Sequence, residues 1–152
     1  MDIQFFDFET DHVKSLRTIP MIVRFKLEVC GITLSLRTWG RLGISTRARL
    51  VTMAVDSLEA VQAYRNFLCH AIRDVGDLVI PEEEVSRPAW DDRARIPEVV
   101  ARKAEEAKVR LRHARRWSDL GTLQRFALVK LTRGAQEQAQ FVPALREFGL
   151  TA

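Results

Sequence analysis

The sequence repeats one thirteen-residue pattern, W-x-x-L-G-x-x-x-R-x-x-L-V, at residues 39–51 and again at 117–129. Six of the thirteen positions are identical, whereas unrelated segments would match at only about one position in fifteen. Each copy follows an Ile-Pro pair, at 19–20 and at 96–97, and the segments that these pairs open share five of eleven residues. Self-similarity at a fixed spacing indicates duplicated structural units. The chain is therefore predicted to fold from two related halves.

Each half is predicted to begin with a helix that leads into a short strand. Pro20 and Pro97 lie where proline is favoured, in the first turn of a helix, and Gly31 suits the left-handed residue that ends one. The apolar period then changes from helical to alternating over 32–36, and the second copy has a comparable stretch at 109–112. We therefore expect a helix–short strand–helix unit in each half, with the two strands paired as a small two-stranded ribbon.

The other segments predict further helices and one exposed connection. Ser57 and Gly76 bound a long helix over about 57–75, which is predicted to bridge the repeats. Residues 77–95 contain prolines and adjacent acidic residues without an apolar period, which is typical of an exposed loop. Shorter helices are predicted from a Ser45 or Thr46 cap to about Val55, from Thr122 to Leu131, and around Phe141, Leu145 and Phe148. The expected fold is a mainly α single domain over 1–152, with repeat units at about 19–54 and 96–132.

Composition places the chain among globular proteins. Hydrophobic residues make up 47% of the 152 positions and charged residues 29%, which excludes an intrinsically disordered chain. The net charge of +4, from 24 basic and 20 acidic residues, permits a nucleic-acid partner without requiring one. Two cysteines, Cys30 and Cys69, in a sequence without an export signal are expected to be free thiols. No stretch approaches membrane-spanning length, so we expect a cytoplasmic protein that does not enter a membrane.

No motif in the sequence predicts catalysis, a metal or a cofactor. The three histidines and two cysteines lack the close spacing of zinc ligands. Gly40 and Gly43 lack the G-K-[ST] ending of a phosphate loop, and no G-x-S-x-G nucleophile motif is present. We therefore expect a non-catalytic protein without a bound metal or cofactor. An unrecognised enzyme stays an open alternative.

A basic segment at 110–116 is the main candidate for contact with nucleic acid. Guanidinium groups bind phosphate, and an aromatic ring such as that of Trp117 can stack on a base. The alternative is that this segment is a solvated basic face and that Trp117, which has a repeat partner in Trp39, packs in the interior. The candidate phosphate contacts are Arg110, Arg112, Arg115 and Arg116.

The repeated arginines, Arg47 and Arg125, have a structural interpretation. Each lies three residues before a leucine of the repeat. We expect them to hydrogen-bond carbonyl groups at helix ends or to pair with carboxylates. Replacement of either by Ala would then cost on the order of 1 to 3 kcal/mol, because it leaves those partners unsatisfied.

Several longer strings are similar to those of one protein family. They are FDFE at 6–9, SLRTIPM at 15–21, VRFKL at 23–27, CGI at 30–32, AYRNFL at 63–68, LQRFAL at 123–128 and FVPALREF at 141–148. On these strings, which extend over nearly the whole chain, the sequence resembles the nitrate reductase-associated protein family. Its arginine-rich second repeat and its shifted central loop depart from the pattern of the cyanobacterial members of that family.

The resemblance implies an accessory role in nitrate assimilation, because family members tend to be encoded beside genes for assimilatory nitrate reductase and the molybdenum cofactor. It implies protein–protein contact that serves assembly, maturation or stability, with nitrate reductase or another molybdoenzyme as the partner and no catalytic residue to carry over. The candidate partner contacts are Phe6, Asp7, Glu9, Arg17 and Arg24. The alternative for the aromatic residues of the N-terminus is that they cover the core. A nucleic-acid-binding regulator that uses Arg110 to Arg116 is the competing prediction.

Overall fold

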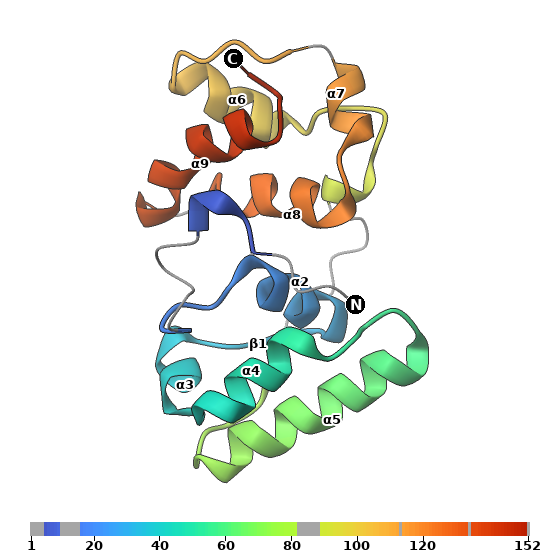
Figure 1. The fold of residues 1–152 in the computed structure, drawn as a ribbon, viewed down its shortest axis with the longest axis vertical. Helices are drawn as coiled ribbons and strands as arrows, with labels where there is room; N and C mark the ends of the chain where they lie inside the picture. The colour runs from blue at the N-terminus through green and yellow to red at the C-terminus, as the bar shows by residue number, and fades with distance from the viewer. Residues whose placement is uncertain (1–4, 10–15, 82–88, 113, 134, 152) are drawn as a thin grey trace. The chain divides into compact units, whose positions relative to one another are not determined.

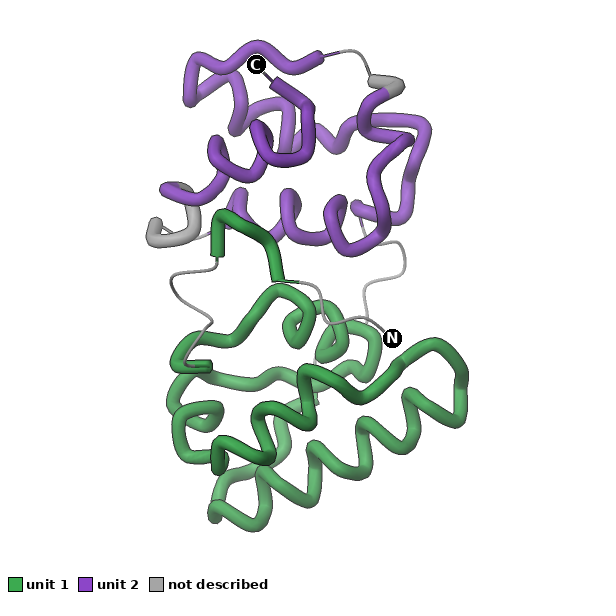
Figure 2. Tube along the Cα trace, viewed as in Figure 1, with its two compact units in different colours: residues 1–84 green, residues 85–152 purple. Residues whose placement is uncertain are grey.

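The computed structural model describes residues 5–9, 16–81, 89–112, 114–133 and 135–151. Within them the chain is mainly α-helical, as predicted, and it divides into two compact units, residues 1–84 and 85–152 (Figures 1 and 2). The two predicted repeat units fall one in each compact unit. A single domain over 1–152 stays a prediction.

Unit 1 is built around three packed helices. Its elements are η1 (Asp7–Glu9), α2 (Met21–Cys30), β1 (Ile32–Thr33), α3 (Leu36–Arg41), α4 (Ile44–Thr52), α5 (Leu58–Asp74) and β2 (Ile80–Pro81). Helices α2, α4 and α5 contact one another. Their buried side chains include Val23, Leu27, Leu50, Tyr64 and Leu68. The long helix α5, predicted to bridge the repeats, thus packs on two helices of its own unit.

Local cap chemistry sets the ends of α2 and α5 close to where the sequence predicts them. Helix α2 follows Pro20 and ends at Gly31, whose φ of 71° lies in the left-handed region that glycine adopts most readily. Helix α5 follows Ser57, whose Oγ accepts a hydrogen bond from the Ala60 N–H at 3.0 Å. The chain leaves α5 through Gly76, with φ of 81°. These predicted helix ends are confirmed.

The predicted cap of α4 by Ser45 or Thr46 is wrong. The helix begins earlier, with Gly43 as its N-cap, and it ends three residues before the predicted Val55. The side chain of Leu42, just before the cap, is 2% exposed. Burial of that leucine fixes the turn between α3 and α4, so tertiary packing decides the start of the helix over the hydroxyl signal.

A two-stranded ribbon is present, but its second strand is not the predicted one. Strand β1 pairs antiparallel with β2, in a register that places Thr33 opposite Ile80. The pairing follows from the turn at Gly76, which lets the chain return along β1 after α5. The predicted partner, 109–112, lies in unit 2. The prediction failed because the return path of the chain after a helix is not encoded in either strand.

Unit 2 is centred on α8. Its elements are η2 (Ala89–Asp91), α6 (Glu98–Glu106), α7 (Ala114–Asp119), α8 (Thr122–Lys130) and α9 (Ala135–Glu147). Trp90 of η2 packs edge-on against Phe126 of α8, with ring centroids 4.9 Å apart. The Arg112 N–H donates to the Leu150 carbonyl at 2.7 Å, so the backbone expected to pair with β1 bonds instead to the C-terminal residues of its own unit. The predicted last helix is confirmed as α9, which contains Pro143.

Identical positions of the sequence repeat make matching contacts in the two units. Trp39 and Trp117 are both fully buried. Their indole N–H groups donate to the carbonyls of Leu16 and Asp92, both at 2.8 Å. Helices α3 and α7 begin three residues before these tryptophans, and α4 and α8 begin five residues after them. The internal duplication itself stays a prediction.

The repeated arginines also make matching contacts. Each guanidinium bonds the leucine carbonyl that precedes its helix and one carbonyl farther upstream, which confirms the prediction of bonds to carbonyls at helix ends. The acceptors are Leu42 and Leu16 for Arg47, and Leu120 and Trp90 for Arg125. The two sites differ in burial, because Arg125 is only 4% exposed while Arg47 is half-buried.

Candidate functional site

Two of the five predicted partner contacts are part of the interior. The Glu9 carboxylate accepts hydrogen bonds from the Phe6 N–H and from the Met21 N–H, each at 3.1 Å. Met21 is the first residue of α2, where a negative charge is stabilised by the free N–H groups and the helix dipole. Glu9 is 5% exposed and Phe6 3%, and the Phe6 ring stacks on that of Phe8. The hydrogen bonds of Glu9 to backbone N–H groups give this side chain a structural role, and the burial of the Phe6 ring does the same for Phe6.

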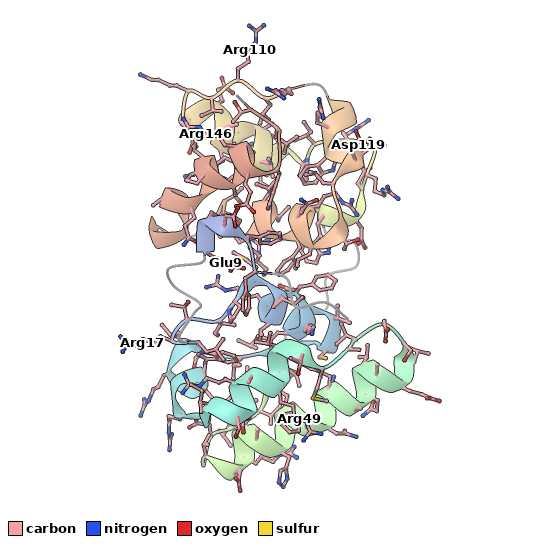
Figure 3. The ribbon with its side chains drawn as sticks, in the orientation of Figure 1. Glu9, Arg17, Arg49, Arg110, Asp119 and Arg146 are labelled. Atoms are coloured by element: carbon pink, nitrogen blue, oxygen red, sulfur yellow. The ribbon has the colours of Figure 1, made fainter. Side chains whose placement is uncertain are left out.

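The other three predicted contacts lie at or near the surface. Asp7 and Arg17 are exposed, and Figure 3 shows Arg17 extending outward beside α3. Arg24 is half-buried, and its Nε donates to the Ile19 carbonyl at 3.1 Å. The structure therefore leaves Asp7 and Arg17 as the accessible members of the predicted set, and their contact with a partner stays a prediction.

The basic segment has arginines at the surface, but the aromatic ring expected to stack on a base is buried. Arg110, Arg112 and Arg116 are exposed, whereas the side chain of Arg115 lies outside the described residues. The Trp117 ring is fully buried with its N–H bonded. A buried ring cannot stack on a base, so the stacking contribution expected for this segment is absent. Only phosphate contact by the arginines is left to the nucleic-acid hypothesis.

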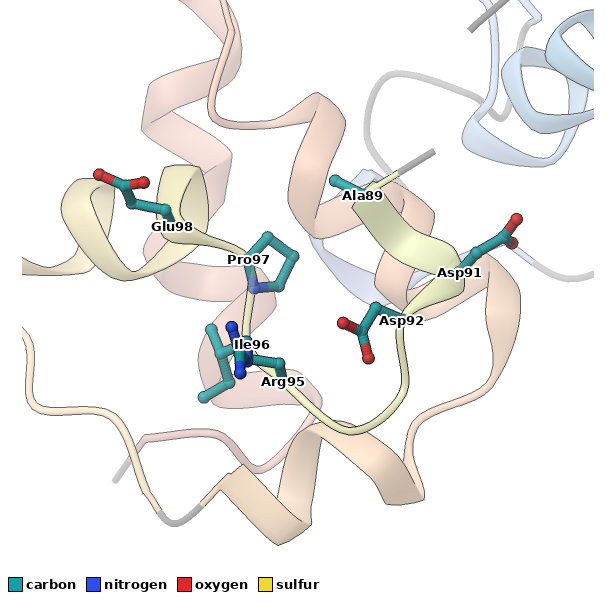
Figure 4. A pocket seen from close by; sticks show the side chains of 7 residues that line it. All are labelled: Ala89, Asp91, Asp92, Arg95, Ile96, Pro97 and Glu98. Carbon is teal, nitrogen blue, oxygen red and sulfur yellow. The ribbon is translucent and has the colours of Figure 1, made fainter. Parts of the chain in front are cut away.

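A cavity of about 680 Å³ lies in unit 2 at the start of α6. Figure 4 shows its lining: Ala89, Asp91, Asp92, Arg95, Ile96, Pro97 and Glu98. The carboxylates of Asp91 and Glu98 point away from each other, and Asp92 Oδ1 accepts a hydrogen bond from the Ala94 N–H at 2.9 Å, which closes a local turn. The acidic groups do not converge on one point, so the cavity alone assigns no ligand.

Two buried ionisable side chains of unit 1, those of Lys26 and Tyr64, bind the end of α4. Lys26 is 1% exposed, and its Nζ donates to the Val51 carbonyl at 2.7 Å and to the Met53 carbonyl. Burial lowers the pKa of Lys26. The Tyr64 hydroxyl donates to the Leu50 carbonyl at 2.8 Å, and burial raises its pKa. These contacts satisfy carbonyls at the end of α4 that have no partner within the helix.

Sequence reasoning missed the role of Lys26, although a signal was present. The residue lies within the apolar stripe of α2, between Val23 and Leu27, and has a repeat partner in Lys103. A lysine at a core position needs acceptors, and helix-end carbonyls supply them. Burial also raises the pKa of Cys30 to about 11, while nearby Arg65 acts in the opposite direction. Both cysteines are free thiols, as predicted.

Two general features of the described residues bear on function. No helix among them is long and apolar enough to cross a membrane. Their side chains include no group of three or more His, Cys, Asp or Glu that could hold a metal ion.

Comparison with known proteins gives one family. A model described as conserved nitrate reductase-associated protein matches residues 5–148. The match confirms the resemblance drawn from the sequence strings. No curated protein and no solved structure matches the chain.

Proposed function

Because the chain belongs to the nitrate reductase-associated protein family, we propose that it is a non-catalytic accessory protein for assimilatory nitrate reductase. It acts in the assembly, maturation or stability of the enzyme through protein–protein contact. The observation that carries this proposal is the family match over residues 5–148, which covers both compact units. The family's name associates its members with nitrate reductase, and the accessory role is our extension of that association.

The buried polar groups support contact over catalysis. An acid, base or nucleophile must reach a substrate, and in active sites such groups converge on one cavity. In the described part of unit 1, Glu9, Lys26 and Tyr64 direct their polar atoms at backbone groups of helix ends. The carboxylates beside the cavity of unit 2 do not converge. This use of polar groups favours a protein that acts through its surface.

Deletion of the gene in its own host tests the proposal. Nitrate reductase activity is assayed beside the levels of the reductase polypeptide and its transcript. Normal polypeptide with low activity supports a maturation role, and normal transcript with little polypeptide supports a stabilising role. Unchanged activity overturns the nitrate assignment.

The competing function is a nucleic-acid-binding regulator, and the exposure of Arg110, Arg112 and Arg116 favours it. Such a regulator binds DNA with an affinity that falls steeply with salt, and replacement of Arg112 and Arg116 by Ala reduces that salt dependence. In the deletion strain, this function predicts loss of the reductase transcript together with its activity.

A further inference from the structure

Four large apolar side chains are exposed in one region of unit 1. They are Leu36 at 58% exposure, Ile44 at 64%, Leu78 at 86% and Ile80 at 56%. We call these four residues the apolar end patch. Single exposed apolar residues are ordinary on protein surfaces, but a cluster of them marks an interaction site.

Two contacts hold the segments of the apolar end patch together. Strand pairing places Ile80 opposite Thr33. Thr33 lies three residues before Leu36 in the sequence. An ion pair of 2.8 Å joins Arg41 to Asp77, which precedes Leu78. Ile44 begins α4, three residues after Arg41. Each member of the patch is therefore within three residues of a contact that ties β1 or α3 to the chain after α5.

The repeat shows that the fold does not require these apolar residues. Leu36 and Ile44 are the first residues of α3 and α4, and the same places in the second copy, at the starts of α7 and α8, hold Ala114 and Thr122. Between these two places, the tryptophan, leucine and glycine positions are identical in both copies. Packing accounts for the shared residues, so it leaves the exposed leucine and isoleucine of unit 1 unexplained.

Positive charge borders the apolar end patch. Arg37 is exposed next to Leu36, and Arg41 is 46% exposed even though it pairs with Asp77. Arg17 is exposed as well. The carbonyl of its neighbour Leu16 accepts hydrogen bonds from Trp39 of α3 and Arg47 of α4, which fixes that backbone next to the two helices that begin with Leu36 and Ile44. An apolar surface bordered by guanidinium groups complements apolar side chains flanked by carboxylates.

We propose that the apolar end patch docks a segment of the reductase that presents apolar side chains flanked by Asp or Glu. The proposal rests on the proposed function and names the surface that serves it. Leu36 and Leu78 act as the apolar anchors, and Arg17 and Arg37 pair with carboxylates at the rim. It also gives Arg17, a predicted partner contact, its place in the interface.

The test uses the full chain and nitrate reductase purified from the same host, with affinities measured by biolayer interferometry. The central variant combines Leu36→Ala and Ile44→Thr, the residues that the second repeat carries at the starts of its helices. It removes apolar contact while keeping side chains that the same local structure accepts. We expect the dissociation constant to rise at least about tenfold. The Arg37→Glu variant should weaken binding severalfold and reduce its salt dependence.

Matched controls come from surfaces outside the patch. Leu58 is 90% exposed, but it lies at the first residue of α5. The patch residues Leu78 and Ile80 follow the other end of this helix, which is about 25 Å away at 1.5 Å per residue. The Leu58→Ser and Arg110→Glu variants should bind within about twofold of the wild type. All variants should keep the helical circular dichroism and the melting temperature of the wild type, because every replaced side chain is exposed.

The outcomes separate the two proposals. Normal binding by the patch variants beside a binding wild type overturns the docking surface and leaves the proposed function standing. A wild type that does not bind the reductase overturns the proposed function and this occupant with it. Self-association of the wild type in sedimentation equilibrium that the double variant abolishes assigns the patch to a second copy of the chain, which also overturns the proposal.

Discussion

Replacing Arg125 by Ala should destabilise the protein more than the matching replacement of Arg47. Both guanidinium groups bond two backbone carbonyls. Arg125 is 4% exposed, so water cannot readily replace its donors, whereas Arg47 is half-buried and its acceptors can be hydrated. A hydrogen bond from a charged group contributes about 1.5 to 3 kcal/mol, and a buried acceptor left without a donor adds its desolvation cost.

These contributions give the expected magnitudes. Loss of two buried bonds should lower the free energy of unfolding by about 3 to 5 kcal/mol for Arg125→Ala, and hydration should limit the loss to about 1 to 2 kcal/mol for Arg47→Ala. For a chain of this size, the larger loss corresponds to a melting temperature lower by roughly 6 °C or more. Arg125→Lys keeps the charge but lacks the fork that reaches both carbonyls, so its loss should be intermediate.

Urea and thermal unfolding followed by circular dichroism measure the three variants against the wild type. The two arginines occupy the same place in the repeat, and each bonds the leucine carbonyl before its helix. Two further differences act in the same direction as burial: Arg125 also donates to the Thr122 Oγ1 at 3.3 Å, and the Leu16 carbonyl that Arg47 bonds keeps the Trp39 N–H as a second donor. Equal losses for Arg125→Ala and Arg47→Ala would refute the reasoning, since they would show that solvent access to the acceptors does not set the cost.

Two further predictions concern unit 1. Burial raises the pKa of Cys30 from 9.0 to about 11, so between these values the unfolded chain releases a proton that the folded chain keeps. The free energy of unfolding should therefore fall as the pH rises from about 9 towards 11, by up to about 2 kcal/mol. Urea titrations at both pH values measure this change in the free energy of unfolding. The change should be smaller for Cys30→Ala than for the wild type, while Cys69→Ala serves as the matched thiol deletion. An equal change with pH in Cys30→Ala and the wild type would contradict this. Gly31→Ala should lower the free energy of unfolding by about 1 kcal/mol because φ is 71° there. Gly40 lies within α3, and a Cβ added there would meet no neighbouring atom, so Gly40→Ala should raise the free energy of unfolding by about 0.5 to 1 kcal/mol. Equal melting temperatures for the Gly31 and Gly40 variants would show that backbone conformation does not decide the effect of the added methyl group.

The parts of the fold predicted from the sequence are those set by local chemistry. Gly31 ends α2 because its backbone adopts a left-handed conformation, and Ser57 caps α5 because its hydroxyl reaches an N–H three residues away. Both signals lie within one turn of the helix end that they determine. The partner strand of β1 depends on the path of the chain after Gly76, and no residue of β1 encodes that path.

The candidate site shows the same division. The acidic N-terminus predicted as a contact surface contributes Glu9 to the interior, because this carboxylate meets the free N–H of Met21 twelve residues along the chain. Lys26 bonds carbonyls twenty-five and twenty-seven residues away. Partners at such separations follow from tertiary packing. A charged residue in sequence is therefore compatible with either an exposed contact or a buried cap, and burial decides between them.

The repeat gives a criterion for separating structural from functional residues. Trp39 and Trp117, the most noticeable shared residues, are fully buried and bonded to backbone carbonyls, so their identity in both copies follows from packing. A residue that packing demands in both units cannot distinguish what one unit binds. Specificity must come from exposed residues that differ between the copies, and Leu36, which is exposed and has Ala114 as its counterpart in the sequence, is such a residue. The same reasoning weakens the nucleic-acid hypothesis, because its only aromatic candidate, Trp117, is explained by the interior that it fills.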